Sequence, residues 1–198
     1  MKTCLVLGGA ESLWSDLSRF LGVDGSDGAG SAPCAAGSRW DGVVACNEAG
    51  AKWAGPLDAW ISLHPRFFLS KGWVADRAKQ GHPEPAAFYA QPGARPHIPD
   101  HFIRTSDLFP GQAKSGSSGL YAAKVALIDL GFDRVVFCGV PMTVTPHFWD
   151  QTRKDWGSAE DFREQWLTVP EEYRNRMRSM SGWTRVLLGA PEPMEETT

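Results

Sequence analysis

Short apolar segments alternate with amphipathic segments along most of this chain. Thr3–Leu7 is an apolar run of strand length, and a helical pattern of apolar residues follows it over Leu13–Leu21. The other apolar runs of strand length are Gly42–Cys46, Ala59–Leu63 and Asp133–Val140, with shorter candidates at Ala86–Tyr89, His101–Thr105 and Thr184–Leu188. Further helices are predicted over Phe67–Gln80, Ser117–Leu130, Ala159–Leu167 and Glu171–Met180. This alternation predicts an α/β fold in which an open, mostly parallel sheet lies between two layers of helices.

The spacing of apolar residues predicts the buried side of the helix expected over Ser117–Leu130. Leu120 and Leu127 fall on its apolar face with Ile128 beside them, whereas Lys124 and Asp129 mark the solvent side. We therefore expect this helix to pack broadly against the sheet.

The length and composition indicate one domain. A chain of 198 residues with 42% hydrophobic residues supports one sizeable core, which we place in residues 1–190. Residues 22–38 are rich in Gly, Ser, Ala and Asp and predict a flexible loop, and residues 191–198 predict a disordered acidic tail.

Charge and hydropathy narrow the class of partner. The net charge is −3 and the Lys and Arg residues are scattered, so no basic surface for nucleic acid is expected. No run of about 18 apolar residues is present, and the apolar start of the chain leads directly into Gly8 without a signal peptide. We expect a cytoplasmic protein without membrane contact, and a homo-oligomer is compatible with the sequence.

The cysteines and histidines do not have the spacing of a metal site. Cys4, Cys46 and Cys138 lie in or at the end of apolar strands and Cys34 lies in a loop, so we expect reduced, structural thiols. The five histidines form no Cys-His pair with the spacing of a zinc site, and we expect neither a metal nor another cofactor.

A serine and glycine segment at the start of the helix expected over Ser117–Leu130 has the composition of an anion site. Ser115, Ser117 and Ser118 carry hydroxyl groups, and glycines at 116 and 119 let the backbone approach a ligand closely. The unpaired N–H groups of a helix start lie beside them. We expect Ser115, Ser117, Ser118 and Gly119 to hold a phosphate or another anion.

Other candidate residues follow the predicted strands. Gly8, Gly9 and Ser12 follow the first strand, Asn47 ends the second, His64 follows the third, and His147 lies in the loop after the strand at Asp133–Val140. Ligands bind outside the carboxyl ends of such strands, so we expect these residues to meet in space. Asn47 would bind a base, ribose or phosphate, or else cap the next helix.

The two histidines have chemical alternatives of their own. His64 would bind an anion or transfer a proton, or else bond to the backbone, and His147 would act as a general base. Known nucleotide and hydrolase motifs do not fit. The dinucleotide glycine fingerprint and the phosphate loop of triphosphatases are absent or incomplete, and so is the elbow motif of serine hydrolases.

Several segments together resemble bacterial sialyltransferases and their uncharacterised relatives. They are Leu5–Leu13 with its Gly-Gly turn and Ser-Leu ending, Val43–Asn47, and Ser117–Gly119 followed by the strand ending in Gly139-Val140. Residues 3–142 follow the same order of elements, and the resemblance extends more distantly to archaeal hydroxymethylpterin diphosphokinases. Small phage proteins of unassigned function look similar in length and in the Leu63-His-Pro65 and Met180–Arg185 segments, and such a protein would work in the host cytoplasm.

This resemblance implies a Rossmann-like fold of the sialyltransferase type and a site for a CMP-sugar or related nucleotide-sugar. It implies that Gly8, Gly9 and Ser12 lie near phosphate or ribose, Asn47 near the nucleotide, and Ser117, Ser118 and Gly119 near the phosphate or a sugar carboxylate. His147 is compatible in position with the catalytic histidine of the family. The expected function is metal-independent glycosyl transfer with His147 as the base.

Two alternatives stay open, because Pro141 and Met142 stand where the family has Asp and an aromatic residue. The first is a non-catalytic phage or accessory protein that uses the fold for binding or assembly. The second is a Mg²⁺-dependent phosphoryl or diphosphoryl transferase.

Overall fold

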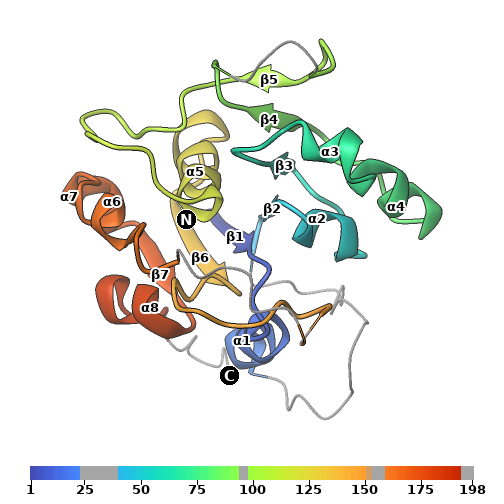
Figure 1. The fold of residues 1–198 in the computed structure, drawn as a ribbon. Helices are drawn as coiled ribbons and strands as arrows, with labels where there is room; N and C mark the ends of the chain where they lie inside the picture. The colour runs from blue at the N-terminus through green and yellow to red at the C-terminus, as the bar shows by residue number, and fades with distance from the viewer. Residues whose placement is uncertain (23–39, 94–97, 151, 153–158, 193–198) are drawn as a thin grey trace.

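The computed structural model describes residues 1–22, 40–93, 98–150, 152 and 159–192. Its sheet has seven strands in the order β5-β4-β3-β2-β1-β6-β7, and every neighbouring pair is parallel. The strands are Thr3–Leu7 (β1), Gly42–Cys46 (β2), Ala59–Ile61 (β3), Phe88–Ala90 (β4), Ile103–Arg104 (β5), Arg134–Cys138 (β6) and Met177–Ser179 (β7). The predicted fold class, an open parallel sheet between two helical layers, is confirmed (Figure 1).

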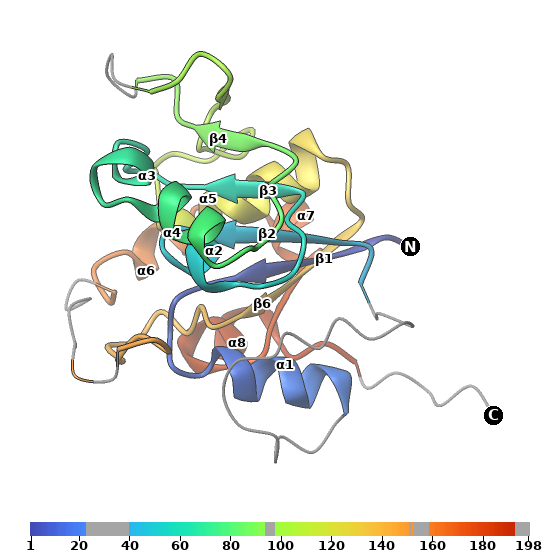
Figure 2. The same ribbon diagram turned by 90° about the vertical axis from the view of Figure 1, so that its right-hand side faces the viewer.

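Helices cover both faces of the sheet. They are Leu13–Leu21 (α1), Ala49–Lys52 (α2), Phe67–Ser70 (α3), Trp73–Lys79 (α4), Ser118–Lys124 (α5), Arg163–Leu167 (α6), Glu171–Arg174 (α7) and Gly182–Leu188 (α8), with a π-helical turn, η1, at Val125–Asp129. Figure 2 shows the strands side on, with α2 and α4 on one face and α5 on the other. No helix in the described part of the chain is long and apolar enough to cross a membrane.

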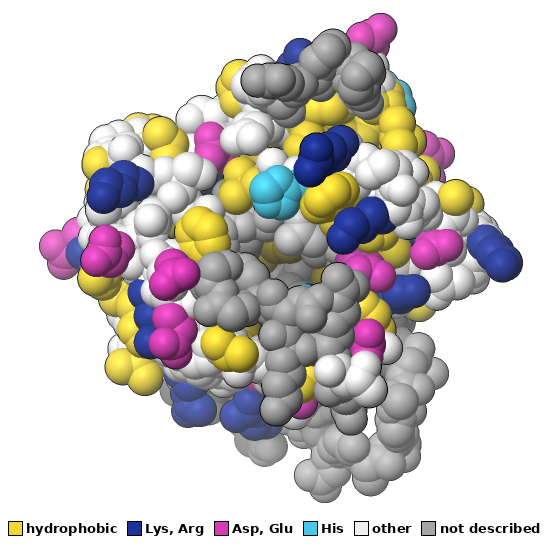
Figure 3. All heavy atoms as spheres, in the orientation of Figure 1, with side chains coloured by type: hydrophobic (Ala, Val, Ile, Leu, Met, Phe, Trp, Pro, Cys, Tyr) yellow, Lys and Arg dark blue, Asp and Glu magenta, His cyan; other side chains and the backbone are white. Residues whose placement is uncertain are grey.

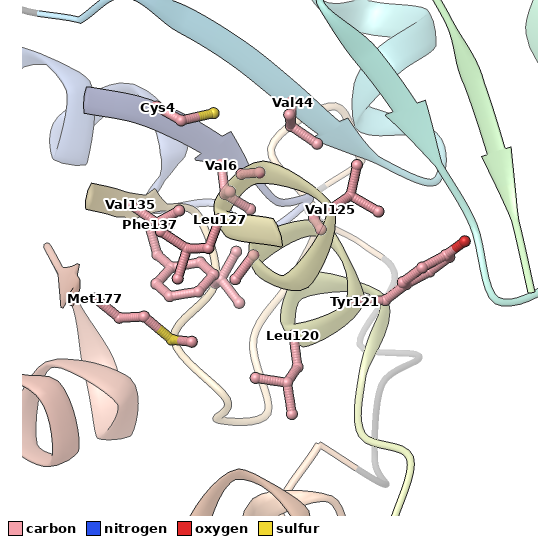
Figure 4. Packing of buried hydrophobic residues seen from close by; sticks show 14 of the residues in the cluster. Cys4, Val6, Val44, Leu120, Tyr121, Val125, Leu127, Val135, Phe137 and Met177 are labelled. Atoms are coloured by element: carbon pink, nitrogen blue, oxygen red, sulfur yellow. The ribbon is translucent and has the colours of Figure 1, made fainter. Parts of the chain in front are cut away.

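The strands contribute alternate residues to two cores. Cys4 and Val6 of β1 belong to the core beneath α5, whereas Leu5 and Leu7 belong to the core beneath α1. All five residues of β1 are buried, as expected for a strand covered on both faces. Figure 4 shows the first core, in which Phe137 of β6 lies among aliphatic residues from the helix.

The chain order creates a reversal beside the central strand. From β1 the strands proceed outward through β2 to β5, and the chain then returns to place β6 on the other side of β1. Loops at such a reversal diverge and leave a crevice at the carboxyl ends of the strands. The fold therefore places a crevice beside the ends of β1 and β6, where a ligand could bind.

Several predicted elements differ from the observed ones. The segment predicted as one helix over Phe67–Gln80 is two helices, because Gly72 between them adopts a left-handed backbone with φ of 70°. The helix predicted over Glu171–Met180 ends at Arg174, and the following residues form β7 at the edge of the sheet beside β6. The short apolar run at Thr184–Leu188 belongs to helix α8 instead of a strand, since a run of this length fits either structure.

The π-helical turn reverses part of the predicted surface of the α5 segment. Lys124 is buried at 4% exposure and its ammonium binds the Asp129 carboxylate at 2.9 Å, whereas Ile128 is exposed. The wider π turn rotates the residues that follow it, so the side chains at positions 124 and 129 meet. The prediction that Lys124 lies on the solvent side was therefore wrong.

The predicted loop and tail lie almost wholly outside the described residues. Gly22 ends α1 with a left-handed C-cap, and residues 23–38 of the predicted loop are not described. Residues 193–198 of the predicted tail are likewise outside the described part.

Candidate functional site

A cleft of about 660 Å³ opens at the carboxyl ends of the central strands. Figure 3 looks onto this face and shows a hollow near its middle, with His, Lys and Arg side chains at the rim. The predicted site residues that line the cleft are Gly8, Gly9, Asn47, His64, Ser115, Ser117, Ser118, Gly119 and His147. The fold thus brings together residues that are up to 139 positions apart (8 to 147).

Asn47 is held so that its amide nitrogen remains a free donor. Its side-chain oxygen accepts hydrogen bonds from Ser62 Oγ at 2.8 Å and from Ser118 Oγ at 3.2 Å. Each hydroxyl also accepts a backbone N–H, at 2.9 Å from His64 and 3.4 Å from Leu63, so each hydroxyl proton is directed at Asn47. Among the described residues the amide nitrogen has no partner, and it is available to a ligand in the cleft.

The backbone of Asn47 is part of the same arrangement. Its φ is 50°, a left-handed conformation that Asn adopts more readily than most residues. Trp60 Nε1 donates to its carbonyl oxygen at 2.6 Å, and its own N–H donates to Ile61 at 2.8 Å. No side chain caps α2, so the alternative role as a helix cap is not the observed one.

His147 carries a nitrogen that can accept a proton. Its Nδ1 lies 3.2 Å from the carbonyl oxygen of Gly9, and a carbonyl only accepts, so Nδ1 bears the proton in this contact. Nε2 of the neutral ring then has a lone pair. The ring stacks on Trp149 with centroids 4.5 Å apart and planes 10° apart, which fixes its orientation at the cleft wall.

In the serine segment, the hydroxyl groups already have partners within the protein, whereas two backbone N–H groups remain free for a ligand among the described residues. Ser117 Oγ accepts from the Leu120 N–H at 3.3 Å as the N-cap of α5, Ser115 Oγ donates to the Asp107 carboxylate, and Ser118 Oγ donates to Asn47. Within the described part of the chain, the N–H groups of Ser118 and Gly119 have no partner. These N–H groups are the free donors of the segment at the cleft.

The glycines of the site are required by close packing. A Cβ on Gly8 would lie 2.1 Å from the Gly139 oxygen, and one on Gly9 would lie 2.7 Å from the Trp149 ring. Gly8 therefore lets the ends of β1 and β6 approach, and Gly9 lets the His147 and Trp149 rings pack against the turn. A Cβ on Gly119 would lie 2.8 Å from Val140, which holds the start of α5 close to β6.

Ser12 does not line the cleft, although the resemblance to sialyltransferases implied a place near phosphate or ribose. Its hydroxyl donates to the Asp16 carboxylate at 3.1 Å and lies 3.1 Å from Ser181 Oγ. Asp16 is fully buried and also accepts from Ser181 Oγ at 2.6 Å and from the Gly139 N–H at 2.9 Å. The Ser12 side chain is thus engaged in a buried network that joins α1 to the ends of β6 and β7.

Sequence reasoning missed other residues that line the cleft. Besides Trp149, the missed residues are Glu48, Phe67, Lys71, Trp73, Gln91, Thr145 and Phe162. Lys71 is the one Lys or Arg among the described lining residues. Its position shortly after β3 and His64 was the available signal, but the sequence predicted one continuous helix through Lys71, whereas Lys71 is the C-cap of α3 just before Gly72.

The thiols are held in their protonated form. Cys46 lines the cleft, and burial raises its pKa to about 12, which makes it a poor nucleophile. Burial also raises the pKa of Cys4 and Cys138, and all three thiols are free. No three His, Cys, Asp or Glu side chains in the described part of the chain lie close enough to hold a metal ion.

Comparison with known proteins identifies the fold. No protein-family model and no curated protein matches the sequence. The sialyltransferase CstII from Campylobacter jejuni in complex with the substrate analogue CMP-3FNeuAc matches with a TM-score of 0.60 and 13% identity, over 98% of this chain and 87% of that chain. The sialyltransferase CST-II in complex with a trisaccharide acceptor and CMP matches with a TM-score of 0.61 and 12% identity, over 100% and 89%.

This chain has the sialyltransferase fold. The similarity extends over the whole fold of this chain. The resemblance predicted from Leu5–Leu13, Val43–Asn47 and the Ser117 segment is confirmed for the fold. The similarity to phage proteins and to pterin diphosphokinases stays a prediction.

Proposed function

We propose that this protein is a glycosyltransferase-like enzyme that binds a nucleotide-activated sugar, with CMP as the favoured nucleotide, and transfers the sugar without a metal ion. The observation that carries the proposal is the convergence of Asn47, the start of α5 and His147 on one cleft. The solved structures with the same fold contain CMP or a CMP-sugar analogue, which supports a nucleotide in this cleft.

Each group has a part in the proposed transfer. An acceptor hydroxyl oxygen forms a bond to the anomeric carbon of the sugar, and His147 Nε2 takes the hydroxyl proton. The bond between the anomeric carbon and the phosphate oxygen breaks, and its electron pair leaves with CMP. The Ser118 and Gly119 N–H groups and the Asn47 amide would stabilise the negative charge of this phosphate.

The shape of the cleft favours this function over the two alternatives. A protein that retained the fold for assembly alone would need an extended apolar surface and no formed cleft, whereas His64 and His147 line one cleft here. A Mg²⁺-dependent phosphoryl transferase normally holds its ion with several carboxylates. Glu48 is the one carboxylate among the described residues that line the cleft, which gives that alternative less support.

The first test is calorimetry with CMP, UDP and GDP. The second test measures the release of CMP from a CMP-sugar as the sugar is transferred to water or to an acceptor. His147→Ala should reduce release by about 100-fold to 10,000-fold, the usual contribution of a general base. The affinity for CMP should change less than threefold, about 0.6 kcal/mol.

His101→Ala is the matched control, because His101 is exposed and does not line the cleft. It should release CMP at the wild-type rate. A folded wild-type protein that binds none of the three nucleotides contradicts the proposal, and so does a His147→Ala variant with full activity.

A further inference from the structure

Basic side chains gather around one aromatic ring at the rim of the cleft. The Arg66 guanidinium carbon lies 5.1 Å and the Lys71 ammonium 4.4 Å from the centre of the Phe67 ring, and the His64 ring centre lies 5.6 Å from it. We call His64, Arg66, Phe67 and Lys71 the basic rim. These residues lie in α3 and its flanking turns, directly after β3, where a loop can meet a ligand outside the sheet.

The cations of the basic rim have no acidic partner. No ion pair joins Arg66 or Lys71 to a carboxylate in the described part of the chain, and neither side chain forms a hydrogen bond there. Glu48, which lines the cleft together with Lys71, is not paired with either cation. The ring of Phe67 holds both cations by cation–π contact while leaving their N–H donors available.

The depth of the cleft separates the basic rim from the groups assigned to the nucleotide. Cys46, Ser117 and Ser118 are exposed by 5%, 4% and 9%, so the nucleotide end is the enclosed part. His64, Arg66 and Lys71 are all exposed. A second substrate that arrives over a bound nucleotide would therefore meet the basic rim.

We infer that the basic rim binds the acceptor, and that this acceptor is a sugar with an anionic group, either a carboxylate or a phosphate. This inference rests on the proposed function and specifies its second substrate. Arg66 offers a planar set of donors for a carboxylate or phosphate, and Lys71 adds a positive charge beside it. A neutral sugar would leave both cations unpaired and would bind more weakly.

The test measures binding of galactose, galacturonate and galactose 6-phosphate to the protein saturated with CMP, by calorimetry or ligand-observed NMR. At low salt, at least one of the two anionic sugars should bind ten or more times more tightly than galactose. Arg66→Gln with Lys71→Gln should remove this preference and leave the CMP affinity unchanged. The stronger of the two anionic ligands identifies whether the anion is a carboxylate or a phosphate.

Lys79→Gln with Arg185→Gln is the control for net charge, because both residues are exposed and lie outside the cleft lining. This pair should keep the preference for the anionic sugar. Equal loss in both double variants would assign the preference to the overall charge and would overturn the inference.

Other outcomes separate the inference from the proposed function. CMP binding without preference for either anionic sugar overturns the inference and leaves the nucleotide site in place. A tenfold loss of CMP affinity in the Arg66 and Lys71 variant also overturns it, because the basic rim would then hold the donor phosphate. Failure of the wild-type protein to bind any nucleotide removes the proposed function itself.

Discussion

Two hydroxyl networks lie at the carboxyl ends of the strands, and they differ in what they leave unused. Around Asp16, the Ser12 and Ser181 hydroxyls, the Gly139 N–H and Arg19 all donate to one buried carboxylate. Around Asn47, the Ser62 and Ser118 hydroxyls occupy only the amide oxygen, and the amide nitrogen lacks a partner among the described residues. The first network is closed within the protein and the second ends in a donor.

The difference shows how similar polar residues serve stability or binding. A buried acceptor that takes several donors stabilises the fold, since each donor would be costly without it. A side chain fixed by its own partners, with one donor left over at a cleft, is prepared for a ligand before that ligand arrives. Substitutions that change one network at a time should therefore separate stability from binding.

Asp16→Ala should have the largest effect on stability. It removes the acceptor of the buried Gly139 N–H and of two serine hydroxyls, and the free energy of unfolding should fall by about 3 kcal/mol. Urea denaturation measures this loss, and the affinity of the folded protein for CMP should change less than about threefold.

Asp76→Ala provides the comparison, because Asp76 is an exposed carboxylate on α4. Its effect on unfolding should be below about 0.5 kcal/mol. If Asp16→Ala and Asp76→Ala had the same free energy of unfolding, the network around Asp16 would not be what stabilises the fold.

Asn47→Asp should instead reduce binding. The new carboxylate can still accept from Ser62 and Ser118, but the free donor becomes a negatively charged acceptor. We expect the affinity for CMP to fall at least about tenfold, or 1.4 kcal/mol, while unfolding changes by less than about 1 kcal/mol.

Asn175→Asp adds the same charge at the opposite ends of the strands, outside the cleft lining, and should leave CMP binding intact. Calorimetry measures the affinity of both variants for CMP. Undiminished CMP binding by Asn47→Asp would mean that the free amide nitrogen does not face the nucleotide.

The sequence was most informative where local pattern and burial agree. The bounds of β1, α1 and β2 follow directly from apolar runs and helical spacing. The prediction fails where tertiary contacts decide: β7 forms because β6 offers it an edge, and the π turn at Val125–Asp129 forms with the Lys124 and Asp129 pair. Neither contact leaves a periodic signal in its own segment.

The candidate site shows the same division. The rule that ligands bind at the carboxyl ends of parallel strands was enough to predict that Asn47, His64 and His147 lie close together, and all three line one cleft. The rule gives positions and no directions, so it did not distinguish Ser12, which points to Asp16, from Ser118, which points to Asn47. It also missed Lys71, which lines the cleft just before the helix break at Gly72.

Ser12→Ala should have the smallest effect and tests the comparison most directly. Ser12 loses one hydrogen bond to Asp16 and its contact with Ser181, so the free energy of unfolding should fall by about 1 kcal/mol. The affinity for CMP should stay within about twofold of the wild-type value, because the hydroxyl is engaged outside the cleft. A tenfold loss of CMP affinity with unchanged stability would place Ser12 on the nucleotide. The Asp16 and Asn47 networks would then both belong to the binding site, and the Asp16 network would not serve stability alone.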